Sequence, residues 1–182
     1  DPLQEGYSIS HNFLSDLGGY KSHSGLPNLT SFLIFNFSMT LFILIGVSFL
    51  FIPKLFKDDI LSLIISIIGS VFIFFGTFFF AGVGLTPYDL YLDEHIFFAL
   101  NAFRLLVPGL VLYFFVLMRS NVSKKYSIMI FILLFFTLSY VVYQIVSDSP
   151  LTSIEQMVEQ AIIQKIITFI NIICMFFLSF AF

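Results

Sequence analysis

The sequence has few of the residues on which most soluble enzymes depend. Only 10% of its 182 residues are charged, tryptophan is absent, and cysteine occurs once, as Cys174. A lone cysteine excludes an intramolecular disulfide and a zinc site made of several cysteines. The three histidines show no His-x-x-x-His spacing, so no motif predicts a metal, a cofactor or a set of catalytic residues. The net charge is −3 and no basic tract occurs, so we expect no nucleic-acid partner.

Apolar residues are abundant instead. They make up 59% of the chain, and 27 of them are phenylalanine. A soluble domain of this composition would expose large apolar patches and aggregate. Apolar segments long enough to cross a hydrocarbon core of about 30 Å run over residues 31–52, 60–81, 95–118, 127–146 and 158–182. We therefore predict an all-α integral membrane protein, in which residues 1–182 form a single transmembrane domain with a bundle of five helices.

The placement of charge predicts how these helices are oriented. Two of the connections carry most of the cations: Lys54, Lys57, Arg119, Lys124 and Lys125. Residues 1–30 and the connections 82–94 and 147–157 are acidic and hold a single lysine. Because basic loops stay inside, we predict that loops 53–59 and 119–126 are cytoplasmic in the plasma (inner) membrane. Residues 1–30 then form an extracytoplasmic loop. We expect a sixth helix, running outward, to precede them, with a removed signal peptide as the alternative.

Two segments carry polar or small residues at helical spacing. Small residues line one face of segment 60–81: Ser62, Ser66, Gly69, Ser70 and Gly76. Such a face lets helix backbones approach closely in lipid, which predicts a packing face. In segment 158–182 a polar stripe lies within about 80° on a helical wheel and consists of Gln160, Gln164, Thr168 and Asn171. Polar residues at this depth turn inward, either to bond neighbouring helices or to line a polar cavity.

Arg104 is the least expected residue of the sequence. It lies about 13 Å inside segment 95–118, at 1.5 Å per residue, where a charge costs at least about 2.5–3.5 kcal/mol. Asn101 and Pro108 share its face, and Pro108 frees the carbonyl of Arg104 from its helical hydrogen bond. Three partners would satisfy Arg104: the Asp16 carboxylate from the outer loop, the carbonyl ends of other helices, which accept hydrogen bonds, or a bound anion such as a lipid phosphate. The predicted lipid- or anion-binding pocket is lined by Arg104, Asn101, Lys165, Gln164 and Asn171.

Two stretches carry a resemblance to known proteins, "HNFLSDLGGY" (11–20) and "GVGLTPYDLYLDEHIFFALNAF" (82–103). A Ser-Asp-Leu-Gly loop, followed by Gly-x-x-Pro before a helix that opens with His and has Ala99 four residues on, resembles the DUF998 family. That family is similar to the wider Frag1/DRAM/Sfk1 group of small multi-span membrane proteins, which is tied to lipid handling and membrane regulation. The resemblance implies a six-helix bundle and supplies no catalytic assignment to carry over. It singles out an outer-loop motif made of Ser15, Asp16, Gly18, Pro87 and His95.

The residues themselves leave the role of this motif open. Asp16 and His95 fit a loop anchor and a helix cap, or else a metal or acid–base site. Our main expectation is a non-catalytic membrane protein that binds lipid or serves as an accessory subunit of a larger membrane complex. Its partners would be membrane lipids and other membrane-protein subunits. The alternatives are an intramembrane metal-dependent hydrolase and a transporter with an anion site at Arg104.

Overall fold

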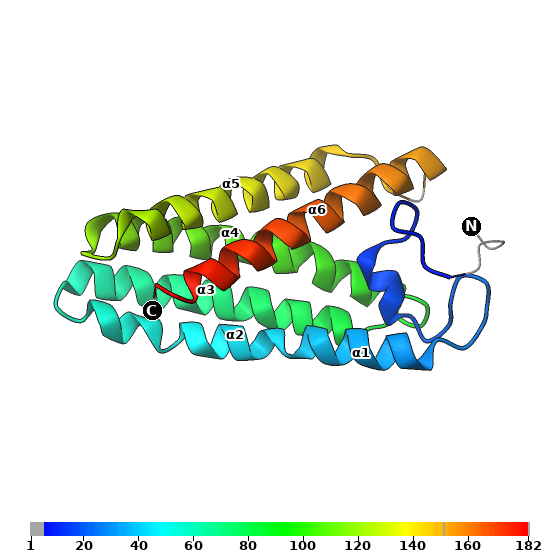
Figure 1. The fold of residues 1–182 in the computed structure, drawn as a ribbon, viewed down its shortest axis with the longest axis horizontal. Helices are drawn as coiled ribbons and strands as arrows, with labels where there is room; N and C mark the ends of the chain where they lie inside the picture. Colours follow the sequence, from blue (N-terminus) through cyan, green and yellow to red (C-terminus); the bar gives the residue numbers. More distant parts are fainter. Residues whose placement is uncertain (1–5, 151, 182) are drawn as a thin grey trace.

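The computed structural model describes residues 6–150 and 152–181 (Figure 1). The first five residues of the predicted 1–30 loop, and Leu151 and Phe182, lie outside the described residues. Five helical segments are long and apolar enough to cross a membrane: Leu29–Phe56, Ile60–Leu85, Leu92–Arg119, Lys124–Val146 and Ile154–Leu178. Apart from one isolated bridge between Lys21 and Pro27, the described residues hold no β-structure. The prediction of an all-α membrane protein with five spanning helices is confirmed.

The first span is not one regular helix. It consists of α1 (Leu29–Thr40), α2 (Phe42–Phe49) and the 3₁₀ helix η2 (Ile52–Phe56). The hydroxyl groups of Thr40 and Ser48 donate to carbonyls four residues earlier, a bond that bends helices. The span passes its predicted end at residue 52, because Pro53 lies in the first turn of η2, where a missing N–H is tolerated.

The remaining spans are α3 (Ile60–Leu85), α4 (Leu92–Arg119), α5 (Lys124–Val146) and α6 (Ile154–Leu178). The helices α4 and α6 begin earlier than the apolar runs predict. Acidic residues occupy the first turn of α4, where they favour the positive end of the helix dipole. At the start of α6, the Ser153 side chain accepts a hydrogen bond from the backbone N–H of Gln156. The polar turns therefore lengthen the helices beyond their apolar cores.

The helices pack in chain order, and α3 and α4 approach most closely. All five predicted small residues of α3 are buried, so the predicted packing face is confirmed and α4 is its main partner. A Cβ atom at Gly109 of α4 would lie 2.7 Å from the Ile73 side chain and 3.1 Å from the carbonyl oxygen of Gly69. Only a residue without a side chain permits this approach.

The bundle has two ends of different character. Loops 53–59 and 119–126 lie together at one end, on the left of Figure 1, and we call this the basic end. Residues 6–28 and the connections after α3 and α5 lie at the other, acidic end. The larger core lies toward the basic end, where the hydroxyl of Ser70 donates to the Phe49 carbonyl (2.6 Å) and lies 2.6 Å from the hydroxyl of Tyr113. These contacts join α2, α3 and α4 inside the bundle.

Candidate functional site

Residues 6–28 fold back onto the acidic end of the bundle. The 3₁₀ helix η1 (Leu14–Gly18) lies against α1, and Ser15 is half-buried within it. A Cβ atom at Gly18 would lie 2.3 Å from the ring of Phe35, so the contact requires glycine. The Ser31 hydroxyl donates to the Leu17 carbonyl at 2.9 Å and thereby fixes η1 on α1.

The other side of the same segment contacts α6. The backbone N–H of Leu14 donates to Oε1 of Gln164 at 3.0 Å. The Lys165 ammonium group donates to the carbonyls of Asn12 and Ala161, the latter at 3.1 Å. Gln164 and Lys165 therefore hold the N-terminal segment, which lies between α1 and α6 at this end (Figure 1).

Asp16 organises the interior of the segment. Its Oδ2 accepts hydrogen bonds from the Phe13 backbone N–H and the Asn12 side-chain amide, both at 3.0 Å, and lies 3.0 Å from Nε2 of His23. The Asp16 carboxylate thus pairs with the His23 ring and not with Arg104. Asp16 was one of three predicted partners of Arg104, and its contacts show that this one is wrong. The reason is local, because donors within seven residues of Asp16 already surround its carboxylate.

The connection between α3 and α4 forms hydrogen bonds that hold the N-terminal segment (residues 6–28) against the bundle. The Asp89 carboxylate accepts the backbone N–H groups of Tyr20 (3.0 Å) and Lys21 (2.9 Å). The Tyr88 ring lies 5.4 Å from the His23 ring, centroid to centroid. Burial raises the pKa of Tyr88 to about 12, and the nearby carboxylates Asp16 and Asp89 add to that shift. The phenol is therefore neutral over the whole physiological pH range.

His95 and Pro87 shape the entry into α4. Pro87 is buried, and its carbonyl accepts the N–H groups of Leu90 and Tyr91 in the turn before the helix. His95 is buried, with Nδ1 2.6 Å from the carbonyl oxygen of Thr86. A carbonyl oxygen can only accept, so Nδ1 carries the proton. His95 thus ties the first turns of α4 to the end of α3, which is the geometry of an anchor.

No metal centre assembles in the part of the chain that the structure describes. It contains no group of three or more His, Cys, Asp or Glu side chains that could hold an ion. His23 and Asp16 form a pair only, and the ring nitrogen Nδ1 of His11 bonds to serine hydroxyls nearby.

The polar stripe of α6 makes contacts with protein groups along its length. Asn171 Oδ1 accepts from the Thr137 hydroxyl of α5 at 3.3 Å. The Thr168 hydroxyl donates to the backbone carbonyl of Gln164 at 2.8 Å, and the Gln160 side chain donates to the Asp148 carbonyl at 2.7 Å. The contacts of Asn171 and Gln160 fit the predicted role of bonding neighbouring helices and loops, whereas the Thr168 hydroxyl bonds within α6 itself.

Arg104 lies on a different surface, which we call the outward face of α4. This face comprises Phe97, Asn101, Arg104, Pro108 and Phe115, which fall within about 60° on a helical wheel. Phe97, Arg104 and Phe115 are exposed, whereas the opposite face of α4 packs in the core. The Asn101 amide donates to the Phe97 carbonyl at 2.8 Å. Arg104 itself makes no ion pair and no side-chain hydrogen bond with any described residue.

The five residues predicted to line one pocket are thus divided among three places. Gln164 and Lys165 hold the N-terminal segment, and Asn171 bonds α5. Asn101 and Arg104 share the outward face of α4, as the helical spacing predicted. A helical wheel cannot tell which face of a helix meets the core, and for this reason the sequence joined residues that the fold separates.

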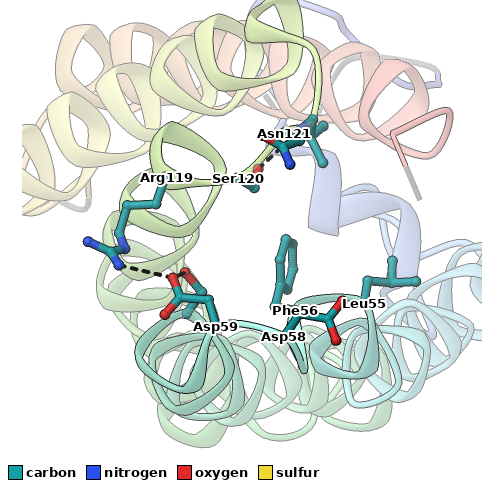
Figure 2. Close-up of a pocket in the computed structure, with 9 residues that line it drawn as sticks. Leu55, Phe56, Asp58, Asp59, Arg119, Ser120 and Asn121 are labelled. Carbon is teal, nitrogen blue, oxygen red and sulfur yellow. Dashed lines mark hydrogen bonds and ion pairs between the residues drawn. The ribbon is translucent and has the colours of Figure 1, made fainter.

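A depression at the basic end was not predicted. It is lined by Leu55, Phe56, Asp58, Asp59, Ser62, Arg119, Ser120, Asn121 and Val122 (Figure 2). Oδ2 of Asp59 lies 3.0 Å from a guanidinium nitrogen of Arg119 and accepts a hydrogen bond from the Ser62 hydroxyl at 2.7 Å. These two donors, Ser62 first, hold the pKa of Asp59 at about 2, below its usual 3.8. The sequence did carry one sign of this arrangement. Asp59 directly precedes an apolar run and Ser62 follows three residues later, a pattern that resembles a helix cap.

Comparison of the chain with known protein families, with curated proteins and with solved structures gives no match. The resemblance of residues 11–20 and 82–103 to the DUF998 family stays a prediction.

Proposed function

We propose that this protein is a non-catalytic accessory subunit that associates with another membrane protein inside the bilayer. The observation that carries the proposal is the position of Arg104, exposed on the outward face of α4 without a partner among the described residues. Charged residues within spanning segments are rare and almost always face a bundle interior or pair with one another. An exposed, unpaired guanidinium on a spanning helix therefore favours a surface that another subunit covers.

The depth of Arg104 favours a protein partner over a lipid headgroup. The helix α4 has 28 residues and polar groups at both ends, so its midpoint is expected near the bilayer centre. Arg104 lies about 18 Å along a helix of about 42 Å, at 1.5 Å per residue. Lipid phosphates lie outside a hydrocarbon core of about 30 Å, so more than about 12 Å separates them from this level. A group supplied by another helix can instead sit at the same depth.

The proposal includes an orientation in the membrane. Loops 53–59 and 119–126 would face the cytoplasm, and the acidic end with residues 6–28 would face outward at the plasma (inner) membrane. The positive-inside rule supports this arrangement, because the cations of both loops gather at one end of the bundle.

Native mass spectrometry of the protein, extracted from its own membranes in mild detergent, tests the accessory role. We expect the wild-type chain to retain a second polypeptide at fixed stoichiometry, and Arg104→Leu to lose most of it. Phe131→Leu, at an exposed position of α5, is the control and should retain the partner.

Two results would overturn the accessory role. One is a native mass spectrum in which the wild-type chain carries no second polypeptide. The other is a retained anionic phospholipid, without polypeptide, that disappears in Arg104→Leu, which would establish lipid binding in its place.

A further inference from the structure

We infer that the outward face of α4 docks a transmembrane helix of another protein, and that this helix carries an aspartate or glutamate at the depth of Arg104. The inference rests on the proposed accessory function and adds the chemistry of the partner. A carboxylate is the side chain that pairs with both ends of a guanidinium fork at once. Inside the hydrocarbon core the attraction between the guanidinium and the carboxylate is stronger than in water, because no solvent competes for the two charges.

The outward face offers further polar groups beside the guanidinium. Pro108 has no N–H, so the carbonyl of Arg104 lacks its usual helical donor. The Asn101 side chain uses its amide nitrogen on the Phe97 carbonyl, which leaves its oxygen as an acceptor on the same face. Donors and acceptors thus lie together at mid-helix, with the exposed rings of Phe97 and Phe115 on either side along the axis.

The spacing of the face fits a helix as the occupant. Its residues recur at steps of four and three from Phe97 through Asn101 and Arg104 to Pro108. This is the repeat by which two helices pack along a seam. The flanking α3 and α5 occupy the sides of α4, so the outward face is the remaining approach to this helix.

A second copy of this chain does not supply the required carboxylate. The acids that α4 and α6 carry lie near the helix starts, as Asp93, Glu94, Glu155 and Glu159. The spans α1–α2, α3 and α5 contain none. Arg104 lies about 18 Å from the start of its helix, at 1.5 Å per residue. A copy inserted in the same orientation therefore offers no acid at that level.

A designed single-span helix tests this inference on the purified chain. The probe is a Leu/Ala-rich helix of about 22 residues with one aspartate at its centre, co-reconstituted with the chain in phosphatidylcholine vesicles. Matched probes carry asparagine at the centre, or the aspartate moved two turns toward one end. Association is measured by energy transfer between labels on the probe and the chain. We expect the central-aspartate probe to bind at least about ten-fold more tightly than both others.

Variants of the chain complete the test. Arg104→Leu replaces an exposed side chain and should abolish the preference for aspartate, while Arg104→Lys should retain part of it. Equal binding of the aspartate and asparagine probes, or a preference that survives Arg104→Leu, would overturn the inference. So would loss of the preference in vesicles with anionic phosphatidylglycerol, since a lipid phosphate would then occupy the site. If the aspartate probe shows no preference but the native complex depends on Arg104, the accessory role stands and the carboxylate partner is wrong. If the probe binds as expected but no native complex is found, the accessory role is wrong and the docking face remains.

Discussion

Two cations on spanning helices, Lys165 and Arg104, have opposite environments. Lys165 donates to the Asn12 and Ala161 carbonyls and lies 5.6 Å from the Tyr7 ring. Its charge therefore has partners within the chain, both in the N-terminal segment and in the preceding turn of α6. Arg104 has no such contacts among the described residues. The difference indicates that Lys165 stabilises the fold of one chain, and it supports the proposal that Arg104 pairs with a group on another protein.

Asp59 predicts a pH dependence at the basic end. Its pKa is lowered from 3.8 to about 2 in the folded chain, so its bonds to Ser62 and Arg119 add stability above pH 4. That stability is lost as the pH falls from about 4 toward 2. We expect Asp59→Asn to flatten this part of the acid dependence of the thermal midpoint, measured in detergent. Asparagine still caps the helix, so the cap itself is not what changes.

Asp58→Asn is the control for this measurement. Asp58 is the exposed neighbour of Asp59 and forms no ion pair in the described chain. Its replacement should leave the slope between pH 4 and 2 unchanged. Equal slopes in both variants would rule out the assigned role of Asp59.

At the scale of the elements, the contact between α3 and α4 determines how the bundle is assembled. Gly109 is the sharpest point to test, because a Cβ atom there meets backbone as well as the Ile73 side chain. Gly109→Leu should lower the free energy of unfolding by about 1–3 kcal/mol or prevent folding, since the helices cannot part without losing the core. Ser139→Leu, at an exposed position of α5, should have little effect. Stability is measured by thermal unfolding or by titration with SDS. A Gly109→Leu variant as stable as the wild type would refute the close approach of α3 and α4 at this position.

The sequence predicts these elements well because lipid imposes simple rules. Each spanning helix follows an apolar run, and the small face of α3 predicted its packing. The helix ends were less predictable, since caps such as Ser153 and acids in the first turn of α4 extend helices into water. The polar stripe predicted that Gln164 turns inward, but nothing in the sequence indicated which groups Gln164 and Lys165 contact. They join α6 to a loop about 150 residues away in the chain, largely through backbone groups.

At the scale of the whole molecule, the two ends of the bundle should lie on opposite sides of the membrane. Ser123→Cys lies at the basic end and Ser149→Cys at the acidic end, each in a Cys174→Ala background without other thiols. An impermeant maleimide added to intact cells should label Ser149→Cys, and Ser123→Cys only after lysis. Labelling of both from the same side contradicts the orientation.

The outward face of α4 connects the fold with the proposed function, and photo-crosslinking in native membranes tests it most directly. A benzophenone amino acid replaces Phe97 on that face, or Phe131 on α5 as the control, because both side chains are exposed rings of similar size. We expect a discrete protein adduct from position 97, none from position 131, and loss of the adduct when Arg104→Leu is added. Lipid adducts alone from both positions, or a protein adduct that is unchanged by Arg104→Leu, would contradict it.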